Sequence, residues 1–286
     1  MAKIGSLLKK KRTPEQEMMW RLNEIEIEQD LRGYNGLSSI GNKCIRQMQL
    51  AHYDCYTVKH SARILRLFNE GHRMEPVLTA ELKKLGIVVK NDQASVSGVA
   101  GHWKGHIDGE GVFHPGSEFF ETYKGMTFLT EFKTHNDKSF KDLLKNKVKV
   151  SKPGHYDQMQ AYMGYRKLTK ALYMAYNKND STIYLEWVDF DEAHFKELQR
   201  KEAEVIMLEV LSDRIGNNQP TWFECKLCDA RQVCFDKKPM KRSCKNCKHV
   251  DVEDNGIWRC TYANVVCDDF KPCDQYEKDE MFWELN

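Results

Sequence analysis

One short run restricts the fold of this chain more than any other stretch. It is TFLTEFKTH at 127–135, which is apolar and rich in β-branched residues, and such a run predicts a buried strand. Because side chains alternate between the two faces of a strand, Glu131 and Lys133 must point to the same side. The pattern therefore predicts a carboxylate and an ammonium group that share one cleft.

A second short stretch, GHIDG at 105–109, could pair with this strand and bring Asp108 beside Glu131. Two carboxylates and a lysine at a strand end would hold a hard divalent cation and activate a water molecule. The alternative is a solvated charge pair, since Glu81 and Lys83 have the same spacing inside a stretch with helical periodicity.

The chain has 286 residues, enough for a substantial core, and we expect one main domain with appendages. A formal net charge of only +2 gives no global basic field, so any contact with DNA must come from local patches. The candidates are the basic start at 1–12 and the lysine-rich segment at 136–152, which is expected to be a mobile loop or short helix. A solvated surface is the alternative for each.

No apolar run reaches the roughly 18 residues of a membrane span, and the start lacks a secretory signal, so we expect a soluble, cytoplasmic protein.

Two helices are expected near the start of the chain. The first covers 13–31, where Thr13 is followed three residues later by Gln16, the pattern of a capping box, and glycines end it at 33 and 36. The second follows a serine N-cap and carries Cys44, for which a small buried apolar residue is the simplest interpretation.

Later segments alternate between helical and strand patterns. Helical spacing at 60–87 is broken by Gly71 and Pro76, which predicts a kink or a junction of two helices, and Glu75 shares a face with Gly71. One long helix is expected at 191–215. Three more elements are expected: an antiparallel meander at 87–134, a helix from Pro153 with Gln158 and Tyr162 on one face, and a β-hairpin at 170–190 closed by Lys178 to Asp180.

Ten cysteines in a chain expected to be cytosolic favour metal ligands over disulfides, because a reducing compartment keeps thiols free. Cys44 and Cys55 stand early, and the other eight lie between 225 and 273. The first late group has the spacing C-x2-C-x5-C: Cys225, Cys228 and Cys234. Cys44 could supply a fourth thiolate if the two ends of the chain meet. Four thiolates suit either zinc or an iron–sulfur cluster, and spacing alone does not choose between them.

The second late group resembles a zinc ribbon, because a C-x2-C pair is followed by further cysteines at suitable distances. Its members are Cys244, Cys247, Cys260, Cys267 and Cys273. We expect Cys267 to be the fourth ligand, with Cys273 as the alternative. A further alternative is that all eight late cysteines form two zinc sites and leave Cys44 in the core.

Taken together, four motifs resemble those of the PD-(D/E)XK nuclease superfamily, in particular its RecB-like and lambda-exonuclease-like (YqaJ-type) branches. They occur in the family's order over roughly residues 60–165: Gly71-x-x-x-Glu75-Pro76, Gly105-His106-Ile107-Asp108, Glu131-Phe132-Lys133 and Gln158-x-x-x-Tyr162. The resemblance implies an α/β fold with a mixed central sheet flanked by helices. The chain departs from many RecB-like members at the first motif, where His72 and Glu75 have a different spacing.

The resemblance also implies roles for the motif residues. Asp108 and Glu131 would bind Mg²⁺ or Mn²⁺, with the Phe132 carbonyl and Glu75 as further ligands, and Lys133 would act on the attacking water. Gln158 and Tyr162 would hold the motif and the DNA strand near the metal. The first cysteine group with Cys44 is similar to the iron–sulfur variant found in AddB and in CRISPR-adaptation nucleases, which implies a 4Fe–4S cluster, with zinc as the alternative.

These implications divide the chain into an N-terminal helical extension at 1–35, a nuclease core at 36–235 closed by the cluster, and a zinc-binding tail at 236–286. The expected function is a metal-dependent DNA exonuclease of recombination, replication or end processing, from a phage or similar mobile element, with a recombination or replication protein as a possible partner. One rival is a nuclease that trims DNA for CRISPR-type adaptation. Another is a non-catalytic DNA-binding scaffold with structural metals.

Overall fold

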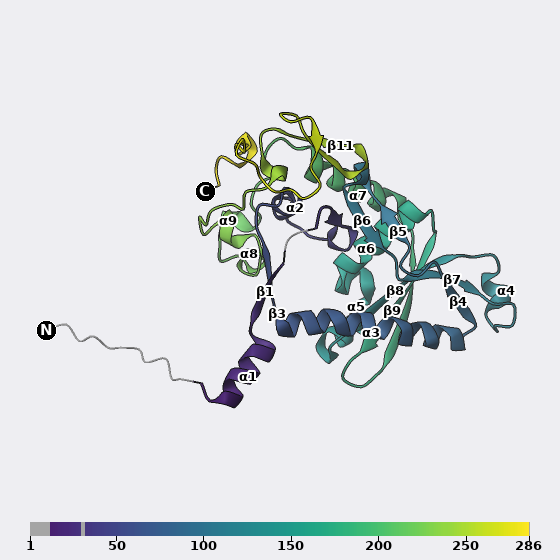
Figure 1. The fold of residues 1–286 in the computed structure, drawn as a ribbon. Coiled ribbons are helices and arrows are strands. Elements are labelled where there is room, and N and C mark those ends of the chain that lie inside the picture. Colours follow the sequence, from purple (N-terminus) through teal and green to yellow (C-terminus); the bar gives the residue numbers. More distant parts are fainter. Residues whose placement is uncertain (1–11, 30–31, 286) are drawn as a thin grey trace.

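A computed structural model describes residues 12–29 and 32–285, and its centre is a five-stranded sheet (Figure 1). The strands lie in the order β10, β9, β8, β7, β4. Their bounds are Ile183–Asp189, Lys170–Asn177, Phe128–His135, Gly109–Phe113 and Ile87–Lys90. Only β8 and β9 are parallel neighbours, and the other pairs are antiparallel, so the sheet is mixed as expected.

Helices cover both faces of this sheet. On one face lie α5 (Asp137–Ser151) and α6 (Pro153–Arg166), with α7 (Glu192–Met207) packed against α6. On the other lies α3 (Ala62–Lys84), which buries Leu78 and Leu82 with Phe128 and Phe132 of the sheet. The strand β8 therefore alternates: its even positions Phe128 and Phe132 face α3, whereas Leu129 joins the core beneath α5 and α6. The buried strand predicted at 127–135 is confirmed.

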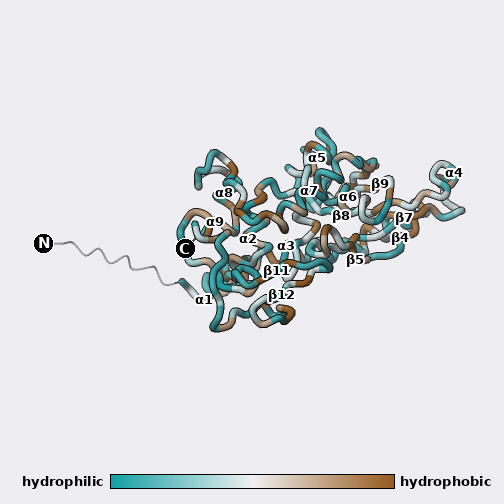
Figure 2. Tube along the Cα trace, turned by 90° about the horizontal axis from the view of Figure 1, so that it is seen from above, coloured by the Kyte–Doolittle hydropathy of each residue, from teal (hydrophilic) through white to brown (hydrophobic). Residues whose placement is uncertain are grey.

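The region expected to form one meander is divided between two sheets. The strands β4, β7 and β8 belong to the central sheet, whereas β5 (Ser95–Ser97) and β6 (Trp103–His106) pair with β2 (Asn35–Gly36) in a separate three-stranded sheet. The chain changes sheets between His106 and Gly109, across Ile107, which is fully buried, and Asp108. The turn between the sheets places Asp108 just before β7, next to the middle strand β8. At its other end the central sheet projects with β4, β7 and α4 (Phe120–Tyr123) away from the body (Figure 1, Figure 2).

The N-terminal helix begins as predicted, but it is shorter than predicted. In α1 (Pro14–Asn23) the Thr13 side chain and Gln16 form the expected capping box. The residues after it form β1 (Glu26–Gln29), because isoleucine and glutamate alternate there with the period of a strand, and β1 pairs with β3 (Val58–Ser61). Together α1 and this two-stranded ribbon form an arm beside the body (Figure 1). The predicted basic start lies outside the described residues except for Arg12.

Three other helix predictions are partly wrong. Cys44 is the N-cap of α2 (Ile45–His52) rather than a residue within it. The predicted break at Gly71 and Pro76 is absent, because α3 is continuous across both, and its C-terminal half is held in line by burial of Leu78 and Leu82. The long helix predicted to reach 215 ends at Met207. In contrast, α6 begins at a proline, and the hairpin of β9 and β10 forms as predicted.

The C-terminal part shares a core with α2. It comprises α8 (Phe223–Lys226), α9 (Arg231–Cys234) and a small sheet of β11 (Val250–Glu253), β12 (Ile257–Cys260) and β13 (Val265–Val266). The buried Trp258 and Phe282 pack with Leu50 and Tyr53. Lys245, also buried, donates hydrogen bonds to the Gly33 and His52 carbonyls at 2.9 and 3.3 Å. The expected boundary at 235/236 therefore does not coincide with a gap in the packing.

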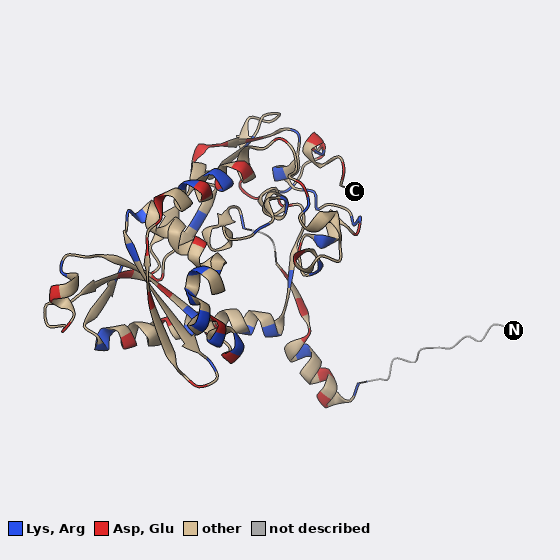
Figure 3. Cartoon of the chain, turned by 180° about the vertical axis from the view of Figure 1, so that it is seen from behind, with Lys and Arg blue, Asp and Glu red and all other residues tan. Residues whose placement is uncertain are grey.

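No helix among the described residues is long and apolar enough to cross a membrane. Lys and Arg are interspersed with Asp and Glu over the face shown in Figure 3. This distribution agrees with the small net charge and gives no single basic field.

Candidate active site and cysteine-lined cavities

The strand β8 places Glu131 and Lys133 together. Both point to the α5 and α6 side of the sheet, and the Lys133 ammonium donates a hydrogen bond to Glu131 Oε1. Glu131 is fully buried, and its second oxygen, Oε2, has no hydrogen-bond partner among the described residues. An ionised carboxylate is costly to bury in this state, which makes the free oxygen a position for a cation. Burial lowers the pKa of Lys133, but the Glu131 and Asp108 carboxylates raise it further, so its pKa lies above the ordinary value.

Asp108 lies beside this pair because the register of β7 and β8 sets Gly109 opposite Thr130. Its Oδ2 accepts a hydrogen bond from the Phe132 backbone N–H at 2.7 Å. Burial, together with the charge of Glu131, raises the pKa of Asp108 to about 7, against the opposing effects of Lys133 and the Phe132 N–H. Two carboxyl groups that repel each other in this way are typical of a site built for a divalent cation.

The third acid, Glu75, reaches the site from α3. Its two oxygens are held by His72 Nδ1 and by the amide of Gln93, each at 3.0 Å. Its charge makes a smaller contribution than that of Glu131 to raising the pKa of Asp108 and of Lys133, so Glu75 lies near both groups. Beside Gly71, one turn earlier, no atom lies within 4 Å of the place that a Cβ would occupy. The surface of α3 is therefore open just before Glu75.

The helix α6 contributes Gln158 and Tyr162, and both are buried rather than on an ordinary surface helix. Tyr162 packs on Gly105, where a Cβ would lie 2.5 Å from the phenol oxygen, so this contact requires glycine. Burial and the nearby carboxylates raise the pKa of Tyr162, which therefore remains a neutral phenol, hydrogen-bonded to Gln158. The pair ties α6 to the strand that precedes Asp108.

A hydrogen-bonded network next to Lys133 was not predicted from the sequence. Tyr173 Oη, on β9, bonds to His135 Nε2 and His155 Nδ1, each at 2.9 Å, and His135 Nδ1 bonds to Ser139 Oγ at 3.1 Å. Burial, reinforced by nearby lysines, lowers the pKa of His135 to about 4 and that of His155 to about 3. Both histidines are therefore neutral at pH 7, and Lys133 and Lys152 are cations near both of them.

The spacing of these histidines was a signal that could have been used. His135 is two residues beyond Lys133 on β8, and His155 is three residues before Gln158 on α6. His135 therefore lies on the face of β8 that carries Glu131 and Lys133, and His155 lies near the face of α6 that carries Gln158 and Tyr162. Tyr173 had no such signal, because its place opposite Glu131 depends on the parallel pairing of β8 with β9.

The first four-cysteine set predicted from the sequence lines one cavity: Cys44, Cys225, Cys228 and Cys234. Two sulfurs accept hydrogen bonds there, Cys44 Sγ from the Gln47 N–H at 3.4 Å and Cys234 Sγ from Arg214 Nε at 3.3 Å. Burial, with Cys44 and Cys234 nearby, raises the pKa of Cys228 to about 12, so the Cys228 thiol is protonated without a metal. The donor set fits a thiolate-bound group, and Cys55 lies apart from it, buried in the core.

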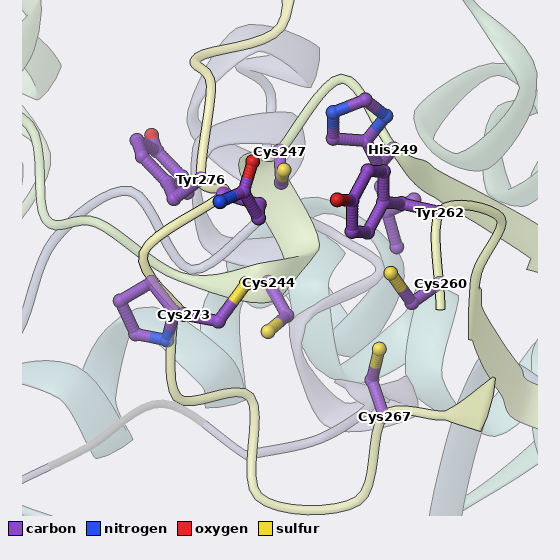
Figure 4. Close-up of a pocket in the computed structure, with 11 residues that line it drawn as sticks. Cys244, Cys247, His249, Cys260, Tyr262, Cys267, Cys273 and Tyr276 are labelled. Atoms are coloured by element: carbon purple, nitrogen blue, oxygen red, sulfur yellow. The ribbon is translucent and has the colours of Figure 1, made fainter. Parts of the chain in front are cut away.

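The second cysteine group lines another cavity, with His249, Tyr262 and Tyr276 (Figure 4). The Cys267 thiol points toward Cys260, and Cys244 and Cys273 lie side by side. Cys267 and Cys273 both line the space, so both alternatives for the fourth ligand are present. Among the described residues, no group of three or more His, Cys, Asp or Glu side chains converges closely enough to hold one metal ion. In each cavity the thiols line an open space. To form a tetrahedral zinc site, the thiols of the second cavity would have to move toward its centre.

The fold and the site define a mixed α/β protein with an acidic, lysine-containing centre formed by the middle strand β8 of its central sheet and the turn before β7. No family model matches the sequence, and no curated protein matches it. Solved structures with a similar arrangement include an alkaline exonuclease (LHK-Exo) from Laribacter hongkongensis, which is 16% identical, with 67% of this chain and 90% of that chain covered and a TM-score of 0.41.

Two further solved structures are similar at the same low level. SSO0001 is 17% identical, with 72% of this chain and 88% of that chain covered and a TM-score of 0.44. A phage-related exonuclease from Haemophilus somnus 129PT is 15% identical, with 48% of this chain and 66% of that chain covered and a TM-score of 0.33.

Proposed function

We propose that this protein is a deoxyribonuclease that hydrolyses phosphodiester bonds from DNA ends with the help of Mg²⁺ or Mn²⁺. The observation that carries the proposal is the buried, unpartnered Oε2 of Glu131 beside Asp108 and Lys133. Oxygen ligands of this kind suit hard divalent cations. Asp108 and Glu131 would bind the ion, and the Phe132 carbonyl and Glu75 would complete the site. A bound divalent ion supplies Lewis acidity at the phosphate and lowers the pKa of a water molecule.

The remaining chemistry belongs to side chains of the chain itself. Lys133 remains charged, so it orients the attacking water and offsets the negative charge that develops on the phosphorus oxygens. Its bond to Glu131 keeps the ammonium at the metal-binding side of β8. Gln158 and the neutral Tyr162 would hold α6 against the strand before Asp108 and, through this packing, hold the motif and the DNA strand near the metal. The products are a 5′-phosphate and a 3′-hydroxyl.

We propose two further groups with structural roles. Cys44, Cys225, Cys228 and Cys234 would bind a 4Fe–4S cluster, and zinc is the alternative at this site. Cys244, Cys247 and Cys260, with Cys267 or Cys273, would bind zinc. Because Cys44 precedes α2 and the other three follow α7, the first group would join both ends of the α/β region.

The biological setting follows from the sequence motifs: recombination, replication or end processing, in a phage or similar mobile element. DNA trimming for CRISPR-type adaptation is the rival setting. A non-catalytic scaffold is disfavoured, since it would have no need for a buried carboxylate with a free oxygen beside a lysine. The proposed protein partner would be a recombination or replication protein.

The test is anaerobic purification, metal analysis and a nuclease assay on end-labelled single- and double-stranded DNA. We expect cleavage that requires Mg²⁺ or Mn²⁺ and is lost in Asp108→Ala and Glu131→Ala. Retention of full activity in either variant would refute the assignment of the site.

A further inference from the structure

A groove lies between the β1–β3 ribbon and the body, and aromatic rings line it. Its aromatic residues are Tyr34, Tyr56, His60, Phe68 and the fully buried Trp103, and the polar ones include Ser38, Asn42 and Gln47. Phe68 is 52% exposed, and its ring meets the edge of His60 with 5.3 Å between centroids. Lys104 and Arg32 hold cationic groups 5.7 and 5.9 Å from the centre of the Tyr34 ring. The groove thus combines the exposed Phe68 ring, the half-buried Tyr34 and His60 rings, the Arg32 cation and uncharged hydrogen-bonding groups, with Asp229 as a lining acid.

The helix α3 connects this groove with the acidic site. Phe68 and Glu75 are seven residues apart, which is about two helical turns, so they lie on the same face roughly 10 Å apart along the axis. Gly71 lies between them on that face, and the space beside it is open. The helix therefore presents an aromatic platform, then the open surface of Gly71 beside the exposed His72, then a metal-site carboxylate.

We infer that this groove binds unpaired nucleotides of the DNA strand that is cut, with a base stacked on Phe68 and the sugar–phosphate chain passing Gly71 toward Glu131. The inference rests on the proposed nuclease function. Rings stack on bases of any sequence, and amide and hydroxyl groups pair with base edges, which is the chemistry of single-strand grooves. A blunt duplex keeps its bases stacked on each other and offers Phe68 no free base face. The groove therefore favours a single-stranded end over a paired one.

Binding in the absence of divalent metal tests the groove separately from catalysis. Fluorescence anisotropy with the full-length chain in EDTA would use labelled oligothymidylate and a blunt duplex as probes. Phe68→Ala should weaken oligothymidylate binding at least about fivefold, the lower range for loss of one stacked base, and leave duplex binding unchanged. Phe68→Trp should retain binding. Leu67→Ala is the matched control, because Leu67 is 42% exposed on the same helix but does not line the groove.

Substitutions at Gly71 provide a second test, because they should change DNA binding without lowering the stability of the protein. Gly71→Ala should raise the melting temperature, because the added methyl group meets nothing and alanine favours the helix. Gly71→Leu should fold equally well, yet lower the rate of single-strand cleavage and weaken oligothymidylate binding in EDTA. A stabilised protein that binds less well would mark an occupied path along α3.

Several results would overturn the inference. They are unchanged oligothymidylate binding in both Phe68→Ala and Gly71→Leu, equal losses for single strand and duplex, or a change of oligomeric state in Phe68→Ala, which would assign the face to a second copy of the chain. Failure of the proposed nuclease function would give a different result from failure of the groove inference. Metal-dependent cleavage would then be absent, whatever the binding measurements in EDTA show.

Discussion

The acidic site and the cysteine-lined cavities are built in opposite ways. Glu131, Lys133, Gln158 and Tyr162 project from regular elements whose backbone hydrogen bonds fix them without any ligand. Most of the cysteines that line the cavities lie at caps, short helices and turns: Cys225 is in a helix of four residues and Cys44 is a cap, whereas Cys260 is the last residue of β12. The buried Glu131 oxygen without a partner is therefore unfavourable in a way that a cation would relieve, whereas the side chains of the described cysteines do not converge closely enough to hold a metal ion. This difference predicts that substitutions in the acidic site change mainly catalysis, whereas substitutions of the cavity-lining cysteines change mainly the stability of the fold.

The largest expected effect is a loss of chemistry without a loss of stability. Glu131→Gln should lower kcat/KM by at least about a hundredfold, comparable to removal of one strong transition-state contact, while the melting temperature stays near that of the parent. An amide is easier to bury than a carboxylate with an unpartnered oxygen. End-labelled DNA cleavage and calorimetry would measure both quantities. A large fall in melting temperature would mean that Glu131 is a structural residue.

The pH dependence of metal binding should sharpen the contrast. Because the pKa of Asp108 is raised to about 7, a cation must displace a proton below that pH. Apparent Mg²⁺ affinity should therefore fall about tenfold for each pH unit below about 7 and level off above it. The stability of the metal-free protein should change with pH in the opposite direction. Its folded state binds the Asp108 proton more tightly than the unfolded chain does, so the contribution of Asp108 to the free energy of unfolding increases as the pH falls from about 7 toward 4. Cleavage rates at subsaturating Mg²⁺ would measure the affinity, and saturating Mg²⁺ provides the control.

In the cysteine region, a substitution should change the stability of the protein more than it changes catalysis. Cys44→Ser should remove the brown colour of anaerobically purified protein, reduce iron from about four per chain, and lower the melting temperature. Cys55→Ala is the control and should retain the colour, because Cys55 does not line the cavity. Metal analysis, absorbance and thermal unfolding would follow these changes. A colourless parent with two zinc ions, and Cys44→Ser as stable as the parent, would instead place both sites among the late cysteines.

The smallest effect concerns the network that borders Lys133. Tyr173→Phe removes the hydroxyl that serves both His135 and His155, so two partly buried ring nitrogens lose their partner. The free energy of unfolding should fall by about 1–3 kcal/mol. Tyr176→Phe on the same strand should change it much less, because its hydroxyl bonds to Ser181 in an exposed loop. Equal effects in denaturant titrations would show that the network contributes nothing beyond an ordinary surface bond.

Local geometry allowed part of this protein to be predicted from sequence alone. The two-residue period of a strand places Glu131 with Lys133, and the four-residue spacing on a helix places Gln158 with Tyr162. The Thr13 capping box is local in the same sense. These relationships hold because neighbouring φ and ψ angles determine them, whatever the rest of the chain does.

Tertiary structure decided everything that depends on distant segments. It divided the predicted meander between two sheets and so placed Asp108 at a turn, kept α3 continuous through Pro76, and set Tyr173 opposite Glu131. It also brought Cys44 into one cavity with cysteines that follow it by more than a hundred residues. Burial of apolar surface from several elements at once selects these arrangements, and no local pattern in the sequence encodes which surfaces will meet.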